Sequence, residues 1–472
     1  MYKLFYIFPA LLFFLPAGAQ NEQKMFWALN GSASAFTWDN TTGNNRIDNG
    51  SGTWNAGAKT WSFNKGITDL IWRPGATAIF GGNPGTGAGG TVTVSGTQTV
   101  QSLVFNTPAT GNFTLTGGTI TNISGMITAN DTASINSTLA GTSGLTLAGP
   151  SIITINAATT YTGTTTVNSG TLVLANGIAN STVVTLSTPI VIHSGATLSA
   201  DITGNINLFG AISGPGTLSI INAGSQTMRL YGDNSGFTGN FSEPAVTRGM
   251  MWSDNGGAGN AALTGSAAAS WNLSGFFGVI ETAGAATPTV QLGSLSGTNS
   301  STNLGAFSGS GIKTLQVGAL NTTTSYAGSI VDNPLGSGTP VVAFTKVGTG
   351  TLTLGGTNAY SGITTVNAGT LAFTTAVPTS ATWNIALNAT ATPTSAASGL
   401  ITLPAAPGMA GKTVNIILTG ASTGFTWQAV SWTGSTSGAP TLKINGVTVT
   451  SGVPSAGTTV TFTATSGIKV TR

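Results

Sequence analysis

Short runs in which apolar and polar residues alternate recur along most of the chain. Val, Leu and Phe alternate with Thr in residues 91–94 (TVTV), 113–116 (FTLT) and 145–147 (LTL), and turn residues separate many such runs. Alternation with a period of two places every second side chain on one face of a strand. The pattern therefore predicts many short strands with an apolar inner face and a Thr-rich outer face. After the N-terminal segment no stretch has the period and caps of a helix, so we expect almost no helix.

One twelve-residue motif, called the repeated word below, occurs twice within this pattern. Residues 161–172 read YTGTTTVNSGTL and residues 360–371 read YSGITTVNAGTL, with nine identical positions in register. Upstream, residues 144–147 (GLTL) match residues 350–354 (GTLTL) once a difference in loop length is allowed. A repeated strand-turn-strand unit with loops of variable length indicates a β-solenoid.

The second copy, residues 348–371, resembles the autotransporter-associated β-strand repeat, also called the passenger-associated transport repeat, of secreted bacterial proteins. Weaker partial copies surround Phe237 and Tyr326. The resemblance implies a secreted, passenger-like β-helix and no particular activity. We therefore expect an all-β fold, a β-solenoid of the right-handed parallel β-helix type.

The N-terminal part of the chain contains two segments that precede the regular pattern. Residues 1–19 have a basic start, an apolar stretch and small residues before the expected cleavage site, which is typical of a secretory signal peptide. Residues 20–90 hold five of the ten tryptophans. We expect this second segment to cap the first coil of the solenoid, because an end coil has no neighbour to cover it.

The rest of the chain divides into segments that differ in composition and in how regularly the repeat pattern occurs. Residues 91–373 are expected to form the β-helix, with an insertion at about 221–290, where the sequence is less repetitive and richer in charge. Residues 374–399 are rich in Thr, Ala and Pro and are interpreted as a linker. Residues 400–472 are expected to form a C-terminal β cap or small sandwich, with a two-residue hairpin turn at Asn445 and Gly446.

Composition narrows the class of protein. Charged residues make up 5% of the chain, and there is no cysteine, so a disulfide scaffold is excluded. Hydrophobic residues make up 40%, which argues against a disordered chain. The net charge of +3 comes from basic residues scattered singly along the chain, so we expect no nucleic-acid partner. We also expect no transmembrane segment in the mature chain, because no later stretch is apolar enough.

Few side chains in this sequence are candidates for catalysis or ligand binding. Asp233, Glu243 and Asp254 in the expected insertion are candidate catalytic acids, although no tight spacing such as Asp-x-Asp supports them. His193 is the only histidine, and it is interpreted as structural. With no Cys and one His, we expect no metal site and no cofactor. Tryptophan rings can stack on sugars, and the candidate sugar-binding residues are Trp38, Trp54, Trp61, Trp252 and Trp271.

Two classes of function remain open on the sequence alone. The leading hypothesis is a non-enzymatic, secreted or cell-surface solenoid that acts as an adhesin or as a component of the extracellular matrix. The alternative is a carbohydrate-binding or polysaccharide-degrading β-helix. Expected partners are polysaccharides or other cell-surface components, and self-association is a third hypothesis, because an uncovered end strand recruits other strands.

Overall fold

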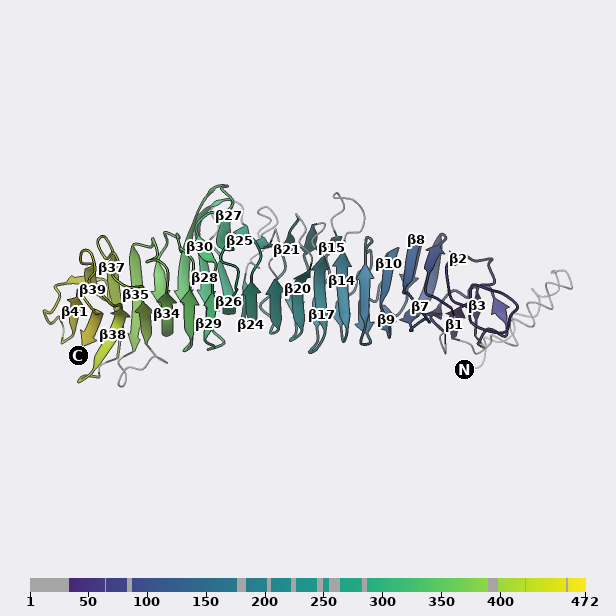
Figure 1. The fold of residues 1–472 in the computed structure, drawn as a ribbon, viewed down its shortest axis with the longest axis horizontal. Helices are drawn as coiled ribbons and strands as arrows, with labels where there is room; N and C mark the ends of the chain where they lie inside the picture. Colours follow the sequence, from purple (N-terminus) through teal and green to yellow (C-terminus); the bar gives the residue numbers. More distant parts are fainter. Residues whose placement is uncertain are drawn as a thin grey trace, which may run out of the picture. The chain divides into compact units, whose positions relative to one another are not determined.

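A computed structural model describes residues 34–63, 65–82, 87–175, 184–201, 205–221, 226–243, 249–253, 264–281, 287–388, 398–420, 422–455 and 457–472. The expected signal peptide and Asp254 lie outside these residues. The described chain contains strands and turns and no helix, and it divides into two compact units, residues 1–141 and 142–472. In each unit the strands follow one another in chain order as parallel ladders (Figure 1). The prediction of an all-β solenoid is confirmed.

The first unit is built from two parallel ladders and one antiparallel element. One ladder contains β1 (Ala35–Trp38), β5 (Ala76–Phe80), β7 (Thr97–Phe105) and β9 (Met126–Ala129). The other contains β2 (Gly52–Trp54), β6 (Thr91–Val94), β8 (Phe113–Asn122) and β10 (Ala133–Ala140). The short strands β3 (Trp61–Ser62) and β4 (Asp69–Leu70) pair antiparallel beside β1.

The second unit contains four ladders. The first joins β11 (Leu145–Ala148), β13 (Thr165–Val167), β16 (Ile190–Ile192) and β19 (Ile212–Ser213). The second starts with β12 (Ile152–Ile155), β14 (Thr171–Ala175), β17 (Thr197–Asp201), β20 (Thr217–Ile221), β22 (Asn240–Glu243), β24 (Gly265–Leu273) and β26 (Thr289–Ser296). It continues through β28 (Ser310–Val317), β31 (Thr339–Lys346), β33 (Thr364–Val366), β35 (Thr382–Asn388), β37 (Thr413–Thr419) and β39 (Thr441–Ile444).

Two further ladders complete the coils of this unit. One joins β15 (Val184–Leu186), β18 (Ile206–Leu208), β21 (Met228–Leu230), β23 (Met250–Ser253), β25 (Phe277–Glu281), β27 (Asn303–Phe307) and β30 (Ser329–Val331). The other joins β29 (Thr324–Tyr326), β32 (Thr351–Leu354), β34 (Gly369–Phe373), β36 (Gly399–Thr402) and β38 (Thr426–Ser431). We call one circuit of the chain through these ladders a coil.

The alternation predicted from the sequence fills the core. In β32, Leu352 and Leu354 point inward and are at most 1% exposed, while the threonines between them are partly exposed. Like side chains on neighbouring coils also bond to each other, as in the 3.1 Å hydrogen bond from Asn415 Nδ2 to Asn384 Oδ1. Both features follow from parallel pairing in register, which repeats each side chain about 4.8 Å along the stack.

The expected insertion is part of the regular coil where it is described. β22, β23, β24 and β25 pair in parallel with the strands before and after them, and the partial repeats near Phe237 and Tyr326 lie within coils. The expected linker also contains a core strand, since β35 pairs with β33 and β37 and Trp383 is fully buried. In both places the sequence differs from the repeat but keeps mostly apolar residues at its inward positions, with Glu243 of β22 as an exception.

The C-terminal segment continues the coils before the strand direction changes. β36, β37, β38 and β39 each extend a parallel ladder. β39 then turns back into β40 (Val447–Val449), and Asn445 and Gly446 have φ angles of 47° and 85°, which confirms the predicted two-residue hairpin. β41 (Thr459–Thr463) and β42 (Gly467–Thr471) add antiparallel strands beside β38.

Among the described residues there is no helix of the length and hydropathy needed to cross a membrane.

Candidate functional site

The two described acids among the catalytic candidates lie in different environments. Asp233 is exposed on a turn, where its Oδ1 accepts hydrogen bonds of 2.9 Å from the backbone of Ser235 and from the Thr264 hydroxyl. These bonds lower the pKa of Asp233, with the Ser235 backbone as the largest cause. Glu243 ends β22 with its side chain in the core, 0% exposed. A glycosidase needs two carboxyl groups facing one substrate across a cleft, and this pair does not form that arrangement.

The five candidate sugar-binding tryptophans are core residues. Trp38, Trp54, Trp61 and Trp252 are 0% exposed and Trp271 is 1% exposed. Stacking on a sugar requires a free ring face, which these rings do not have. The prediction of a Trp-lined surface is corrected at these positions, because inward alternation along the strands directs the rings into the coils.

Three of these rings belong to an aromatic cluster in the first unit. The centroid of Trp61 lies 4.9 Å from that of Trp54, 5.3 Å from that of Trp38 and 4.6 Å from that of Trp72. Phe80 from β5 joins the cluster at 5.6 Å from Trp61. Aromatic pairs at such distances pack favourably and exclude water. The arrangement is what a cap over the first coil requires, although the assignment of residues 20–90 as a cap stays a prediction.

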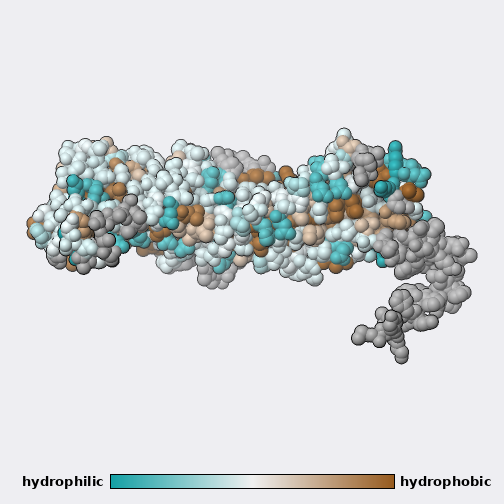
Figure 2. All heavy atoms as spheres, turned by 90° about the horizontal axis from the view of Figure 1, so that it is seen from below, coloured by the Kyte–Doolittle hydropathy of each residue, from teal (hydrophilic) through white to brown (hydrophobic). Residues whose placement is uncertain are grey.

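The remaining chemical groups of the chain are dispersed. His193 is exposed on the turn after β16, where its backbone N–H donates a 2.9 Å hydrogen bond to the Val167 carbonyl. Among the described residues, no group of three or more His, Cys, Asp or Glu side chains is placed to hold a metal ion. On the face shown in Figure 2, residues of intermediate hydropathy cover most of the surface, with hydrophobic residues in small groups.

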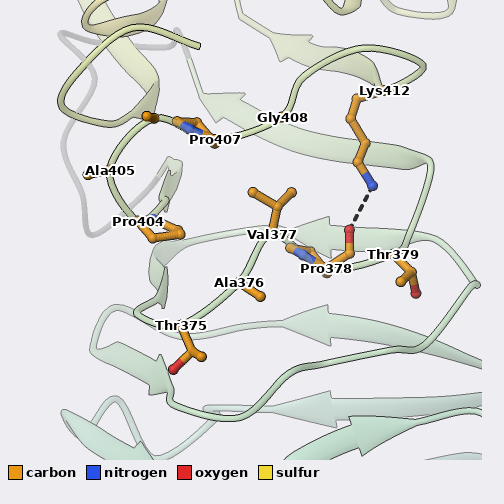
Figure 3. Close-up of a pocket in the computed structure, with 11 residues that line it drawn as sticks. Thr375, Ala376, Val377, Pro378, Thr379, Pro404, Ala405, Pro407, Gly408 and Lys412 are labelled. Atoms are coloured by element: carbon orange, nitrogen blue, oxygen red, sulfur yellow. Dashed lines mark hydrogen bonds between the residues drawn. The ribbon is translucent and has the colours of Figure 1, made fainter. Parts of the chain in front are cut away.

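A groove lies between the turns of two neighbouring coils in the second unit. Its volume is about 430 Å³, and it is lined by residues 375–379, residues 404–408 and Lys412. Figure 3 shows Pro378, Pro404 and Pro407 with Val377 around it, and the Lys412 side chain reaching across toward the Pro378 carbonyl. The lining includes no acidic residue and no aromatic ring. The groove can therefore offer hydrogen bonds and one positive charge, but no acid-base pair.

Lys412 is held in place by backbone oxygens. Its Nζ donates to the Pro378 carbonyl at 2.7 Å and to the Ser380 carbonyl at 2.8 Å, and it lies 5.8 Å from the centre of the Trp383 ring. Burial lowers the pKa of Lys412. An ammonium group has three donors, so two bonds to carbonyl oxygens leave one N–H that can meet a ligand.

Sequence reasoning missed this groove. Residues 374–399 carry its first wall, and their content of Thr, Ala and Pro was interpreted as a linker. The opposite wall comes from the next coil, so the two turns are neighbours only after the coils stack. The strand β35 lies between these two walls in the sequence. The alternation of Trp383, Ile385 and Leu387 with polar or small residues indicates this strand, and all three are at most 1% exposed.

Comparisons with known proteins agree with the repeats in the fold. The family described as passenger-associated-transport-repeat matches residues 138–174 and 344–373, which contain both copies of the repeated word. The chain is also similar to the adhesin BmaC autotransporter of Brucella suis biovar 1 (strain 1330), with 36% identity over 171 residues. The match covers 34% of this chain and 4% of the length of that relative. No solved structure matches the chain.

Proposed function

This chain is an autotransporter-associated repeat protein, and we propose that it acts at the cell surface as a non-enzymatic solenoid with an adhesive or matrix role. The matches to this repeat and to part of an autotransporter adhesin support an exported, cell-surface or extracellular location. The observation that carries the proposal is the match of this chain to part of an autotransporter adhesin. The whole of that relative is far longer than the match, so adhesion by this chain is our proposal.

The architecture supports a structural role. The apolar residues of the repeat are used to fill the coils, and polar side chains of neighbouring coils bond to each other on the outside. Among the described residues, the candidate acids do not converge and the groove contains no carboxylate. A stacked core of this kind can present exposed loops at fixed intervals, which suits the binding of extended polymers.

Adhesion can be tested with beads coated with the whole chain. We expect such beads to adhere to polysaccharide or cell-surface preparations more than beads coated with an unrelated protein of similar charge. The mass distribution of the polysaccharide should stay unchanged after prolonged incubation. Absence of adhesion to every surface, or the appearance of shorter products, would count against the proposal.

Carbohydrate binding in the groove is a second candidate function, favoured by Lys412 and the threonine hydroxyls in its lining. In that case Lys412→Met should weaken binding of acidic oligosaccharides, while the matched change of the exposed Lys469→Met on β42 should not. Equal binding by both variants and by the parent chain would place the contact elsewhere.

A further inference from the structure

Glu243 is a buried carboxyl group that has no basic partner among the described residues. Its side chain is 0% exposed, and neither carboxyl oxygen has a partner with hydrogen-bond geometry among the described residues. An ionised carboxylate in such a place would lose its hydration with nothing to replace it, which is far more costly than burying the neutral acid. The folded coil therefore favours the protonated form of Glu243.

Glycine backbones surround this carboxyl group closely. A Cβ atom added at Gly275 would lie 2.1 Å from Glu243 Oε1 and 2.9 Å from Oε2, and one added at Gly249 would lie 3.0 Å from Oε1. Gly275 follows β24 and Gly249 precedes β23, so both contacts are at a corner of the coil. The described part of the corner is thus closely packed around the side chain.

A second buried polar group without a hydrogen-bond partner among the described residues lies further along the same stack. Tyr326 ends β29, is 0% exposed, and its hydroxyl has no hydrogen-bond partner among the described residues. Its ring lies over Gly297, where an added Cβ would be 3.0 Å from Tyr326 Cδ2. Gly275 and Gly297 lie on the coils between β22 and β29, so a glycine backbone packs against each of the two side chains.

The repeat shows how unusual this tyrosine is. In the two full copies, the hydroxyls of Tyr161 and Tyr360 bond to a threonine four residues later, at 2.8 Å to Thr165 and 2.9 Å to Thr364. The residue four positions after Tyr326 is Ile330, which cannot make this bond. The Tyr326 hydroxyl thus lacks the threonine partner that satisfies the tyrosine in both full copies of the repeat.

We propose that Glu243 forms a proton-controlled joint in the solenoid, which is packed while Glu243 is protonated and opens more readily as the pH rises. Tyr326 is the titratable group near enough to interact electrostatically with Glu243, and the described residues place no lysine, arginine or histidine within ion-pair distance of Glu243. Burial also raises the pKa of Glu243 well above its ordinary value, and the Gly275 backbone offsets part of this shift.

The sign of the effect follows from proton linkage. Above the ordinary glutamate pKa of 4.5 the unfolded chain has lost this proton, while the folded coil keeps it. The stabilisation is therefore complete at acidic pH and is lost as the pH rises toward the higher pKa of the folded state. In that window the equilibrium constant for opening increases by up to about tenfold per pH unit.

Hydrogen exchange of the whole chain, followed by mass spectrometry of its peptides, tests the joint. We expect protection factors in β22, β24 and β29 to fall between about pH 5 and pH 8, by more than those of β35 and β37, which lie in a stretch of the chain without acidic residues. Glu243→Gln, which cannot ionise, should abolish the difference. The matched change Glu281→Gln, at a partly exposed acid 3.4 Å from Arg229, should keep it.

A third variant assigns the proton. Tyr326→Phe removes the phenol but leaves Glu243, so the fall of protection with pH should persist in this variant. The proposal is overturned if the parent chain shows equal protection at both pH values, if Glu243→Gln keeps the difference, or if Tyr326→Phe abolishes it. If the Gln variant does not fold, the pH series of the parent chain still decides, with β35 and β37 as internal reference.

Discussion

Trp61 is the centre of the aromatic cluster in the first unit, and its replacement by alanine tests whether that cluster is a core. The ring is fully buried, with centroid distances of 4.9 Å to Trp54, 4.6 Å to Trp72 and 5.6 Å to Phe80. Removal of a buried aromatic side chain costs about 3–5 kcal/mol, of which part is the cavity that remains. The Trp61 Nε1 has no hydrogen-bond partner, and losing this unsatisfied donor offsets part of the loss. We expect a net cost of about 4 kcal/mol.

Hydrogen exchange in β5 and β7 is a suitable assay, because it reports the first unit separately from the second. A loss of about 4 kcal/mol corresponds to a fall of nearly a thousandfold in the protection of the most stable amides. Ile67→Ala, at a residue of the same unit that is 65% exposed, is the control and should have little effect. A cost below about 1 kcal/mol for Trp61→Ala, within the range of exposed positions, would refute the assignment of this ring to a core.

Three further changes probe the second unit. Thr364→Val leaves the buried Tyr360 hydroxyl without its 2.9 Å partner and should cost about 1–3 kcal/mol in urea unfolding, whereas adding Tyr360→Phe should restore most of the loss. Burial lowers the pKa of Lys346 to about 8, whereas its ordinary value is 10.5. Between these two pH values the unfolded chain binds more protons than the folded chain, so the stability of the fold should rise with pH. Lys346→Met should remove this rise from a pH series of melting temperatures. A Cβ atom at Gly239 would lie 1.7 Å from a backbone oxygen of the preceding coil, so Gly239→Ala should cost about 1–3 kcal/mol or prevent folding. A Cβ atom at Gly355 would have no contact below 3.4 Å, so Gly355→Ala should be nearly neutral in the same melting assay.

Much of the fold follows from local sequence rules. The Leu-Thr alternation and the repeated word predicted stacked strands, and the Asn445-Gly446 dipeptide predicted the hairpin between β39 and β40. These features depend on neighbouring residues only. The regular coils within residues 221–290 were not predicted, because their side chains differ from the repeat even though their inward period is the same.

The placement of chemical groups was harder to predict. Composition cannot distinguish a buried tryptophan from an exposed one, and Trp54 and Trp61 were offered as ligand-binding residues although both lie in the core. For Glu243 a signal was present, since it lies two residues after the buried Phe241 on the same strand and therefore shares its inward face. Tyr326 is 83 positions further along the chain, and only the stacking of the coils brings it within electrostatic range of Glu243.

Adhesion without turnover is the central claim of this account. The most direct measurement is the retention of beads coated with the whole chain on immobilised polysaccharides and cell-surface preparations, combined with mass analysis of the same polysaccharides. We predict retention above the protein control with no change in polysaccharide mass. Shortened products, or no retention on any surface, would contradict the account.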